Sequence, residues 1–236
     1  MKQLLIITPV KNSMHTAVPA IEKVCQSKGE NFYSVYNDYS TPENRGLLET
    51  AASQKGFELI NIEEQVDTPS PNYRFTLRHA RQRALEMNAG LLIIESDVFV
   101  EPDTIEQLYN FAQKTPSCGM VAAITVDDNG QINFPYTYVK SSNKNPIESE
   151  HRLSFCCTLL TLPLLQKLDF DLLSEKKDWY DVQISKDSRR LGFSNYILPN
   201  VKVLHQPHSS RPWKKLKYSN PVKYYIRKWF LGKDRI

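Results

Sequence analysis

The sequence predicts an α/β protein with a Rossmann-like, mostly parallel central sheet, helices on both faces, and a smaller mixed region. Short apolar runs of strand length alternate with amphipathic segments of helix length from residue 4 to residue 94. Glycine or an Asn-Ala-Gly stop ends the helical segments, as at Gly56 and at 88–90. After residue 98 the alternation gives way to an irregular order of strands and helices, which indicates the mixed region.

Each element of the first half has its own local signal. The apolar run that starts at Leu4 ends before Pro9, as expected for a first buried strand. Pro42 is suited to the first turn of a helix, and Gly56 is suited to its end. The expected strands are 4–8, 32–37, 57–62 and 91–94, and the expected helices are 18–26, 42–52 and 72–87.

The second half begins with a helix that 101–103 caps and that runs to about Lys114. Asn129-Gly130 lies between two strand-like runs, 120–126 and 131–138, and predicts a β-hairpin. The polar stretch 140–150 has no period and is expected to be a mobile loop. Further along we expect strands at 153–161 and 201–204 and helices at 164–168 and 179–191.

The composition is that of a globular protein, with 41% hydrophobic and 24% charged residues. The four cysteines lack the spacing of a disulfide framework or a zinc knuckle, so we expect reduced thiols and a cytoplasmic location. The N-terminal apolar run is too short for a signal peptide, and no run reaches the roughly twenty residues of a membrane-spanning helix.

The basic charge is concentrated at the C-terminus. Residues 211–235 hold nine Lys or Arg against one acid, interleaved with aromatic side chains, while the rest of the chain is acidic. This mixture favours an anionic lipid surface or a pyrophosphate, and so peripheral membrane contact at the inner face of the cell membrane. A terminal helix with packed aromatics and solvated lysines explains it equally well. Nucleic acid is disfavoured, because the basic stretch is one short tail on an acidic body.

The glycine positions exclude two common phosphate-binding loops. No two of the eight glycines lie two residues apart, so a GxGxxG loop is impossible, and no GxxxxGK[ST] loop exists. A nucleotide would therefore bind beyond the carboxyl ends of the strands by other side chains.

Acidic residues follow two of these strands. Glu95 and Asp97 end an apolar strand and, two residues apart, are expected to face the same side. Hard cations such as Mg²⁺ or Mn²⁺ take oxygen ligands of this kind and share them with phosphates. The alternative to a cation site is that one of these two acids caps a helix and pairs with an arginine of the helix expected at 72–87. Asp38 is suited to bind a base or ribose, or to form an ordinary Asx turn.

Two further candidates lie in the second half. Asp178 and Asp181 open a helix, where each is either a cap or, for Asp181 above all, a general base. His205 ends a strand and is either a structural histidine or a metal ligand. Zinc bound by His205 and His208 is disfavoured, because no third ligand is suitably spaced.

Taken in order, these segments resemble family 2 glycosyltransferases of the GT-A type. Residues 6–12 are similar to the opening strand and its Pro-Val-x-Asn turn, and 37–41 to the Asp-Asp-Gly-Ser-Thr segment. Glu95-Ser96-Asp97 falls where that family has its DxD motif. Residues 180–185 are similar to the Glu-Asp-Val-Asp helix, and 203–205 to the segment with a histidine near the metal. Asn37, Gln82, Glu95 and Tyr180 depart from the pattern, whereas Asp97, Asp181 and His205 match it.

The resemblance implies an inverting glycosyltransferase with Asp181 as catalytic base and with Asp97 and His205 as ligands of Mn²⁺ or Mg²⁺. It implies a nucleoside diphosphate sugar as donor and a saccharide or lipid-linked acceptor. It also implies one catalytic domain, 1–210, with a nucleotide-sugar half (1–97) and an acceptor-side half (98–210), followed by the tail 211–236. The expected donor-binding residues are Thr8, Pro9, Asn12, Asp38, Arg74, Arg78, Arg81, Glu95 and Ser96.

Two other functions remain open at this stage. A nucleotidyltransferase on a related fold would release pyrophosphate, although such enzymes usually open with a Gly-rich, Arg-containing loop that residues 8–16 lack. A catalytically silent module that binds a membrane or nucleic acid through its tail would not hydrolyse a donor. Hydrolysis of a nucleotide sugar with Mn²⁺ separates a transferase from such a binder.

Overall fold

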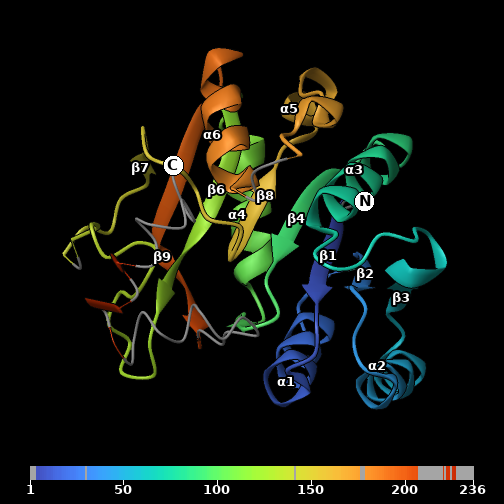
Figure 1. The fold of residues 1–236 in the computed structure, drawn as a ribbon. Helices are drawn as coiled ribbons and strands as arrows, with labels where there is room; N and C mark the ends of the chain where they lie inside the picture. Colours follow the sequence, from blue (N-terminus) through green and yellow to red (C-terminus); the bar gives the residue numbers. More distant parts are fainter. Residues whose placement is uncertain are drawn as a thin grey trace. The chain divides into compact units, whose positions relative to one another are not determined.

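A central β-sheet organises residues 4–206, with nine strands among the described residues (Figure 1). The computed structural model describes residues 4–29, 31–140, 142–175, 179–206, 220, 222–223 and 225–226. The chain divides into two compact units, Met1–Gln206 and Pro207–Ile236. The predicted boundary after residue 210, most of the basic tail, Asp178 and His208 lie outside the described residues. None of the described helices combines the length and the apolar character that crossing a bilayer requires.

The first half of the sheet is parallel, as predicted. Its strands follow the order β3-β2-β1-β4, and every neighbouring pair in this half is parallel. These strands are β1 (Leu4–Val10), β2 (Phe32–Asn37), β3 (Glu58–Asn61) and β4 (Gly90–Ile94). β4 is buried along its whole length, which explains why its sequence is a continuous apolar run rather than an alternating one.

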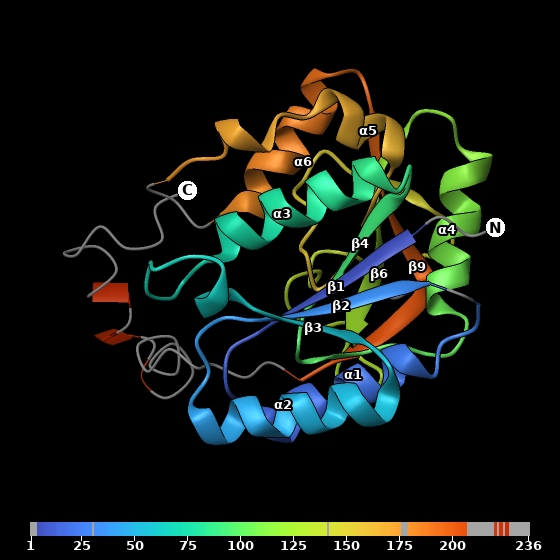
Figure 2. The same cartoon turned by 90° about the vertical axis from the view of Figure 1, so that its right-hand side faces the viewer.

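Helices cover both faces of these strands, so the predicted fold class is confirmed. Figure 2 shows α1 and α2 on one face, and α3, α5 and α6 on the other. Successive residues of β1 point to opposite faces of the sheet. Leu5 packs in the cluster that contains Leu77 of α3, whereas Leu4 packs in the cluster that contains Ile105 of α4. The helices are α1 (Met14–Cys25), α2 (Pro42–Lys55), α3 (Tyr73–Glu86), α4 (Thr104–Lys114), α5 (Leu162–Lys167) and α6 (Tyr180–Arg190), with short 3₁₀ turns η1 (Ile62–Glu64) and η2 (Phe170–Leu172).

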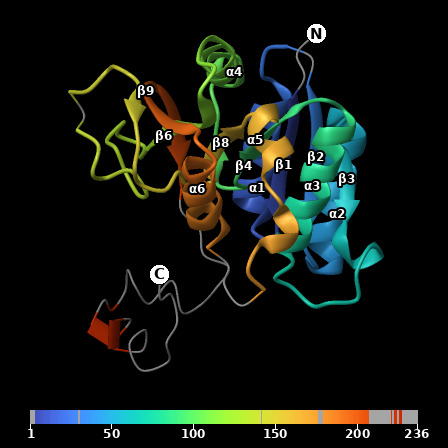
Figure 3. The same ribbon diagram turned by 90° about the horizontal axis from the view of Figure 1, so that it is seen from above.

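The second half of the sheet is mixed. The sheet continues from β4 in the order β8-β6-β9-β5, and β7 pairs with β9. β8 is antiparallel to both β4 and β6, whereas β6 and β9 are parallel. Seen from above, β6 and β9 lie at the opposite end of the sheet from β2 and β3 (Figure 3). These strands are β5 (Val98–Phe99), β6 (Cys118–Val126), β7 (Ile147–Glu148), β8 (Cys157–Leu160) and β9 (Ser194–His205).

The predicted hairpin arm at 131–138 is wrong. A turn does follow β6, but only one isolated bridge, Val126 to Ile132, continues the pairing among the described residues. The edges of β6 are largely occupied by β8 and β9, which leaves little room for another strand. Pro135 also lacks the N–H that a ladder requires.

Two other predictions from the second half need correction. The stretch 140–150, expected to be a loop, contains β7, which pairs with Ile197 and Tyr196 of β9. β9 itself begins at Ser194, well before the predicted strand at 201–204, because its first half pairs in parallel with the start of β6. This longer strand carries His205 at its C-terminal end.

A close approach at Gly119 of β6 makes a stability prediction. A Cβ at this position would meet the Ser188 hydroxyl and lie 2.6 Å from the Phe193 Cβ, which is attached to backbone and cannot swing away. Gly119→Ala is therefore expected to lower the free energy of unfolding of the full chain in urea by about 1–3 kcal/mol.

Gly46→Ala is the matched control, because Gly46 lies within α2 and a Cβ there meets nothing within 4 Å. That change is expected to raise the free energy of unfolding by about 0.5–1 kcal/mol. Equal stability of the two variants would contradict the tight packing of β6 against the Phe193 segment.

Candidate active site

The buried strand β4 leads into the acidic turn Glu95–Val98. Glu95 donates its N–H to the Cys156 carbonyl (3.0 Å), which extends the pairing of β4 with the segment before β8. Val98 then donates its N–H to the Glu95 carbonyl (3.1 Å) and closes the turn. The strand alternation used to predict that Glu95 and Asp97 face one side therefore does not hold here. Ser96 and Asp97 are nevertheless buried.

His205 lies next to this turn. β5 and β9 are antiparallel and pair Val98 with His205. The His205 Nδ1 lies 2.8 Å from the Phe134 carbonyl, which can only accept, so Nδ1 donates this hydrogen bond and Nε2 is left for another partner. Nε2 lies 3.8 Å from the Asp97 Oδ2. A histidine fixed by a carbonyl in this way is the usual form of a metal-ligating imidazole, so the residues fit a divalent cation.

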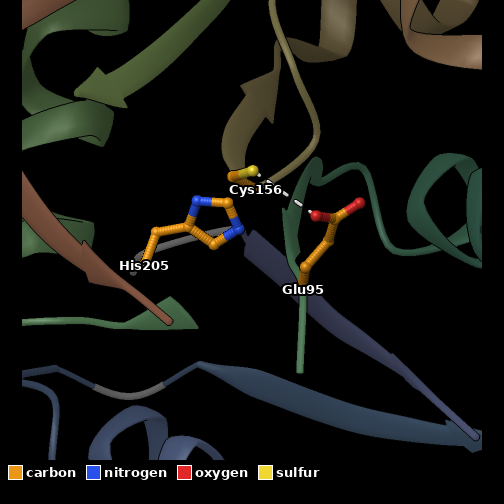
Figure 4. Close-up of side chains that lie close together, drawn as sticks. All are labelled: Glu95, Cys156 and His205. Atoms are coloured by element: carbon orange, nitrogen blue, oxygen red, sulfur yellow. Dashed lines mark hydrogen bonds between the residues drawn. The ribbon is translucent and has the colours of Figure 1, made fainter. Parts of the chain in front are cut away.

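A thiol completes this cluster. Ligand atoms of Glu95, Cys156 and His205 all lie within 4.8 Å of one another (Figure 4). The Cys156 Sγ donates to the Glu95 Oε2 (3.4 Å) and contacts the Ser154 hydroxyl (3.3 Å). Burial raises the pKa of the Cys156 thiol well above its usual value, and the charges of Glu95 and Asp97 raise it further. Both carboxylates therefore act on the same buried sulfur.

Asp181 lies in the first turn of α6. Its Oδ1 accepts the N–H of Val182 (2.9 Å), and its Oδ2 lies 3.7 Å from an Arg152 guanidinium nitrogen. That guanidinium also lies over the ring of Trp179, 5.1 Å from its centroid. The carboxylate is only 17% exposed, and one backbone hydrogen bond and one ion pair hold it.

Tyr73, the first residue of α3, links the two acidic stretches. Its ring packs against Phe155 (6.3 Å between centroids) and against Tyr180 (6.1 Å), the residues that precede Cys156 and Asp181. Burial raises the pKa of Tyr73 well above its ordinary value, and the charges of Glu95 and then Asp181 raise it further. Carboxylates that are far apart in the chain therefore act on one phenol group.

The expected nucleoside residue Asp38 is extensively hydrogen-bonded. It accepts from the Ser70 hydroxyl (2.7 Å), the Asn72 N–H (3.0 Å) and the Asn72 side-chain amide (2.9 Å). These bonds tie the end of β2 to the residue before α3. A carboxylate has about four acceptor sites, so one remains for a ligand.

The opening turn is also held by internal bonds. The Asn12 Oδ1 accepts from the Thr41 N–H and from the Asn44 amide (3.0 Å each). The buried Thr8 accepts from the Tyr33 hydroxyl (2.9 Å). Thr8, Pro9 and Asn12 thus lie at the carboxyl end of β1, where open α/β sheets bind ligands, with Asn12 fixing the neighbouring turn.

The three arginines of α3 that were expected to bind the donor contact another segment of the chain. Arg74 donates to the carbonyls of Leu173 (2.9 Å) and Asp171 (2.8 Å), and Arg78 pairs with the Asp171 carboxylate. Arg81 donates to the carbonyl of Leu165 (3.0 Å). This placement differs from the expected contact with a diphosphate, because the guanidinium groups join α3 to the segment 165–175.

Sequence reasoning missed Cys156 and Tyr73. The cysteine spacing matches neither a disulfide framework nor a zinc knuckle, and Tyr73 belongs to a helix whose most visible feature is its arginines. Neither residue shows a motif. The pairing of β4 with β8, Ile94 opposite Cys157, is the signal that brings Cys156 to Glu95, and it depends on the fold.

Comparison with known proteins identifies a sequence family and similar folds. A family model described as glycosyl transferase family 2 matches residues 5–163. No curated protein matches the sequence significantly. Three similar solved structures are S. aureus TarS 1–349 (15% identity, TM-score 0.61), the mannosyltransferase PcManGT from Pyrobaculum calidifontis with GDP-Man and Mn²⁺ (14%, 0.64), and GalNAc-T7 with UDP, GalNAc and Mn²⁺ (11%, 0.63).

These matches cover 96%, 95% and 89% of this chain, respectively. The chain in turn spans 66%, 63% and 44% of the three solved chains. At these identities the likeness shows a shared fold, and the match of the family model is the stronger finding because it covers most of the chain.

Proposed function

Since the chain belongs to glycosyl transferase family 2, we propose that it transfers one sugar from a nucleoside diphosphate sugar to a hydroxyl of a saccharide or lipid-linked acceptor. The transfer inverts the anomeric carbon and depends on a divalent cation. The observation that supports it most is the convergence of the acidic turn after β4 and the start of α6 on Tyr73. One convergent group of carboxylates supplies both requirements of such a transfer, an ion site and a base.

Asp97 and His205 are the proposed ligands of the cation. The Nε2 of His205 lies 3.8 Å from the Asp97 carboxylate, and hard or borderline cations accept such a nitrogen and oxygen pair. When bound, Mn²⁺ or Mg²⁺ supplies positive charge that stabilises the departing diphosphate. The Phe134 carbonyl and the β5–β9 pairing hold the two side chains in position.

Asp181 is the proposed general base. As the acceptor oxygen bonds to the anomeric carbon, the bond from that carbon to the diphosphate oxygen breaks and its electron pair leaves with the diphosphate. The proton of the acceptor hydroxyl passes to the Asp181 carboxylate. Arg152 and the Val182 N–H fix the orientation of this carboxylate for that transfer.

The donor nucleotide is proposed to lie over the carboxyl ends of β1 and β2. The residues that line this region are Thr8, Pro9, Asn12 and Asp38, with Glu95 and Ser96 next to the ion. We assign the remaining acceptor site of Asp38 to the nucleoside. Arg74, Arg78 and Arg81 are left out of this assignment because they bind the 165–175 segment.

The acceptor is proposed to be a saccharide or a lipid-linked saccharide at the inner face of the cell membrane. The support for a lipid-linked acceptor is the basic and aromatic composition of 211–235.

A donor screen of the full chain tests the proposed function. UDP- and GDP-sugars come first, because similar structures are described with UDP and with GDP-Man, followed by dTDP-sugars. We expect one donor class to raise the melting temperature only with Mn²⁺ present, and to release nucleoside diphosphate when acceptor is added. Pyrophosphate released from a nucleoside triphosphate would instead identify a nucleotidyltransferase. Donor binding without any turnover would identify a silent binding module.

A further inference from the structure

The Cys156 thiol lies within the cation site, yet the proposed transfer does not use it. Cys156 belongs to the segment just before β8, and its backbone carbonyl accepts the N–H of Glu95 (3.0 Å). The sulfur therefore cannot move far from the acidic turn without breaking this pairing. Figure 4 shows the thiol, one carboxylate oxygen of Glu95 and one ring nitrogen of His205 turned toward one another.

The spacing of the Cys156 sulfur and the nearer Glu95 oxygen suits a tetrahedral ion. Zinc binds sulfur at about 2.3 Å and oxygen at about 2.0 Å, so two such ligands of one tetrahedral ion lie about 3.5 Å apart. The Cys156 Sγ and the Glu95 Oε2 lie 3.4 Å apart. Sulfur, imidazole nitrogen and carboxylate oxygen are all ligands that zinc takes, and three protein ligands with a fourth position open are typical of catalytic zinc sites. Manganese and magnesium prefer oxygen and gain little from a thiolate.

We propose that Glu95, Cys156 and His205 form a site for a thiophilic divalent cation such as Zn²⁺, and that this ion competes with Mn²⁺ for His205. Binding converts the thiol to a thiolate and releases its proton to water, so the cation replaces the hydrogen bond from Cys156 to Glu95. The proposal that a thiophilic cation binds here depends only on the cluster of Glu95, Cys156 and His205. The proposal that it competes with Mn²⁺ rests on the proposed function, because it assumes that Mn²⁺ uses the same histidine.

Cobalt absorption tests the binding part without any activity assay. The full chain, freed of metal, is titrated with Co²⁺ alone, and a near-ultraviolet band of thiolate-to-cobalt charge transfer is expected. The band should be lost in Cys156→Ser and Cys156→Ala, and Zn²⁺ should abolish it in the wild type. Cys25→Ser is the control, because Cys25 is exposed in α1 and should leave the band unchanged.

Two results would overturn this site. Either the wild type gives no thiolate band, or the band persists in both Cys156 variants while circular dichroism shows them folded.

Enzyme kinetics test the competition with Mn²⁺. Zn²⁺ should inhibit Mn²⁺-dependent transfer, and the inhibition should weaken by about tenfold or more in Cys156→Ala. If the chain shows no transfer at all, the proposed function fails while the cobalt titration still decides the site.

A separate observation concerns the hydroxyl of Tyr73. This oxygen is fully buried and has no hydrogen-bond partner among the residues that the structure describes. An unpaired buried hydroxyl is costly to a fold and calls for an explanation, such as a catalytic role or a bound water or ion. Its ring lies against Phe155 and Tyr180, between the cation cluster and the proposed base.

From this position we infer that the Tyr73 hydroxyl donates a hydrogen bond to an oxygen of the transferred sugar. The inference rests on the proposed function, because the sugar must lie between the cation, which holds the diphosphate, and the base, which faces the acceptor. Tyr73 thus contacts substrate from the first turn of α3, and its ring, held by Phe155 and Tyr180, sets where the hydroxyl points.

Tyr73→Phe separates a substrate contact from a structural role. It should lower kcat/KM by about tenfold, the effect of one hydrogen bond. Its unfolding midpoint in urea should stay the same or rise, because the lost hydroxyl has no internal partner. Tyr136→Phe is the matched control: the Tyr136 hydroxyl accepts the Ser154 N–H (3.0 Å), so that variant should unfold at lower urea. Unchanged kcat/KM in Tyr73→Phe, with the wild type active, would overturn the contact.

Discussion

The Asp181→Asn variant is expected to lose about 100-fold or more of its kcat while it binds the donor as tightly as the wild type. The amide has the shape of the carboxylate but cannot take the acceptor proton. It still accepts the Val182 N–H and still lies beside Arg152, so the start of α6 should keep its fold. Single-turnover kinetics measure the chemical step, and donor titration by fluorescence or calorimetry measures the affinity.

The control for this variant is Asp187→Asn. Asp187 lies on the same helix and forms a surface ion pair with Arg190, so the same chemical change should leave kcat within about twofold of the wild type, as surface pairs contribute little. Full activity of Asp181→Asn would remove the base assignment. Equal losses in both variants would indicate a general effect on α6 instead.

The Asp97→Asn variant is expected to lose the response to Mn²⁺ together with nucleotide affinity. The amide keeps an oxygen beside the His205 Nε2 but loses the negative charge that binds a divalent cation. The cation affinity should therefore fall by about 100-fold or more, since even residues that only support a ligand cost 10- to 100-fold. Because the cation joins the protein to the diphosphate, donor affinity should fall with it. Calorimetric titration of Mn²⁺, with and without nucleoside diphosphate, measures both losses.

Asp103→Asn is the matched control, because Asp103 is exposed before α4 and makes no side-chain cap hydrogen bond. It should keep the wild-type response to Mn²⁺. A wild-type titration curve for Asp97→Asn would exclude Asp97 as a ligand, and the cation would then have to be held by the remaining residues of the cluster.

The parallel half of the fold could be predicted because its signals are local. β1, β2 and β4 are marked by apolar runs, and the helices between them end at residues such as Gly56, whose φ of 77° favours glycine. The strands then pair in the order that short connections allow. The carboxyl end of β4 followed from this arrangement, and so did the position of the acidic turn.

The mixed half could not be predicted in the same way, because strand pairing there is non-local. Asn129-Gly130 is a strong hairpin signal, yet β6 gives its edges mainly to β8 and β9, which come from later in the chain. The polar stretch around Ile147 shows no strand period but still pairs with β9. The sequence pattern alone does not show which edge of which strand is free to pair.

The same limit applies to the candidate site. Asp97, Asp181 and His205 were identified by their place in a sequence pattern, whereas Cys156 and Tyr73 have no pattern. The arginines of α3 give an amphipathic helix with a basic face, but the sequence does not show whether that face meets a phosphate or a neighbouring segment. In the structure Arg74 and Arg78 meet the segment around Asp171.

The pairing of β5 with β9 bears on how quickly and tightly an ion is captured. Besides the contact of Val98 with His205, the Gln206 N–H donates to the Asp97 carbonyl (3.0 Å), so backbone bonds fasten the two ligand-bearing stretches to each other. An arriving cation meets ligands that are already assembled and loses little affinity to the ordering of loops. If Asp97 and His205 hold the ion as proposed, we expect the metal to bind before the sugar nucleotide, so that the order of addition is metal first.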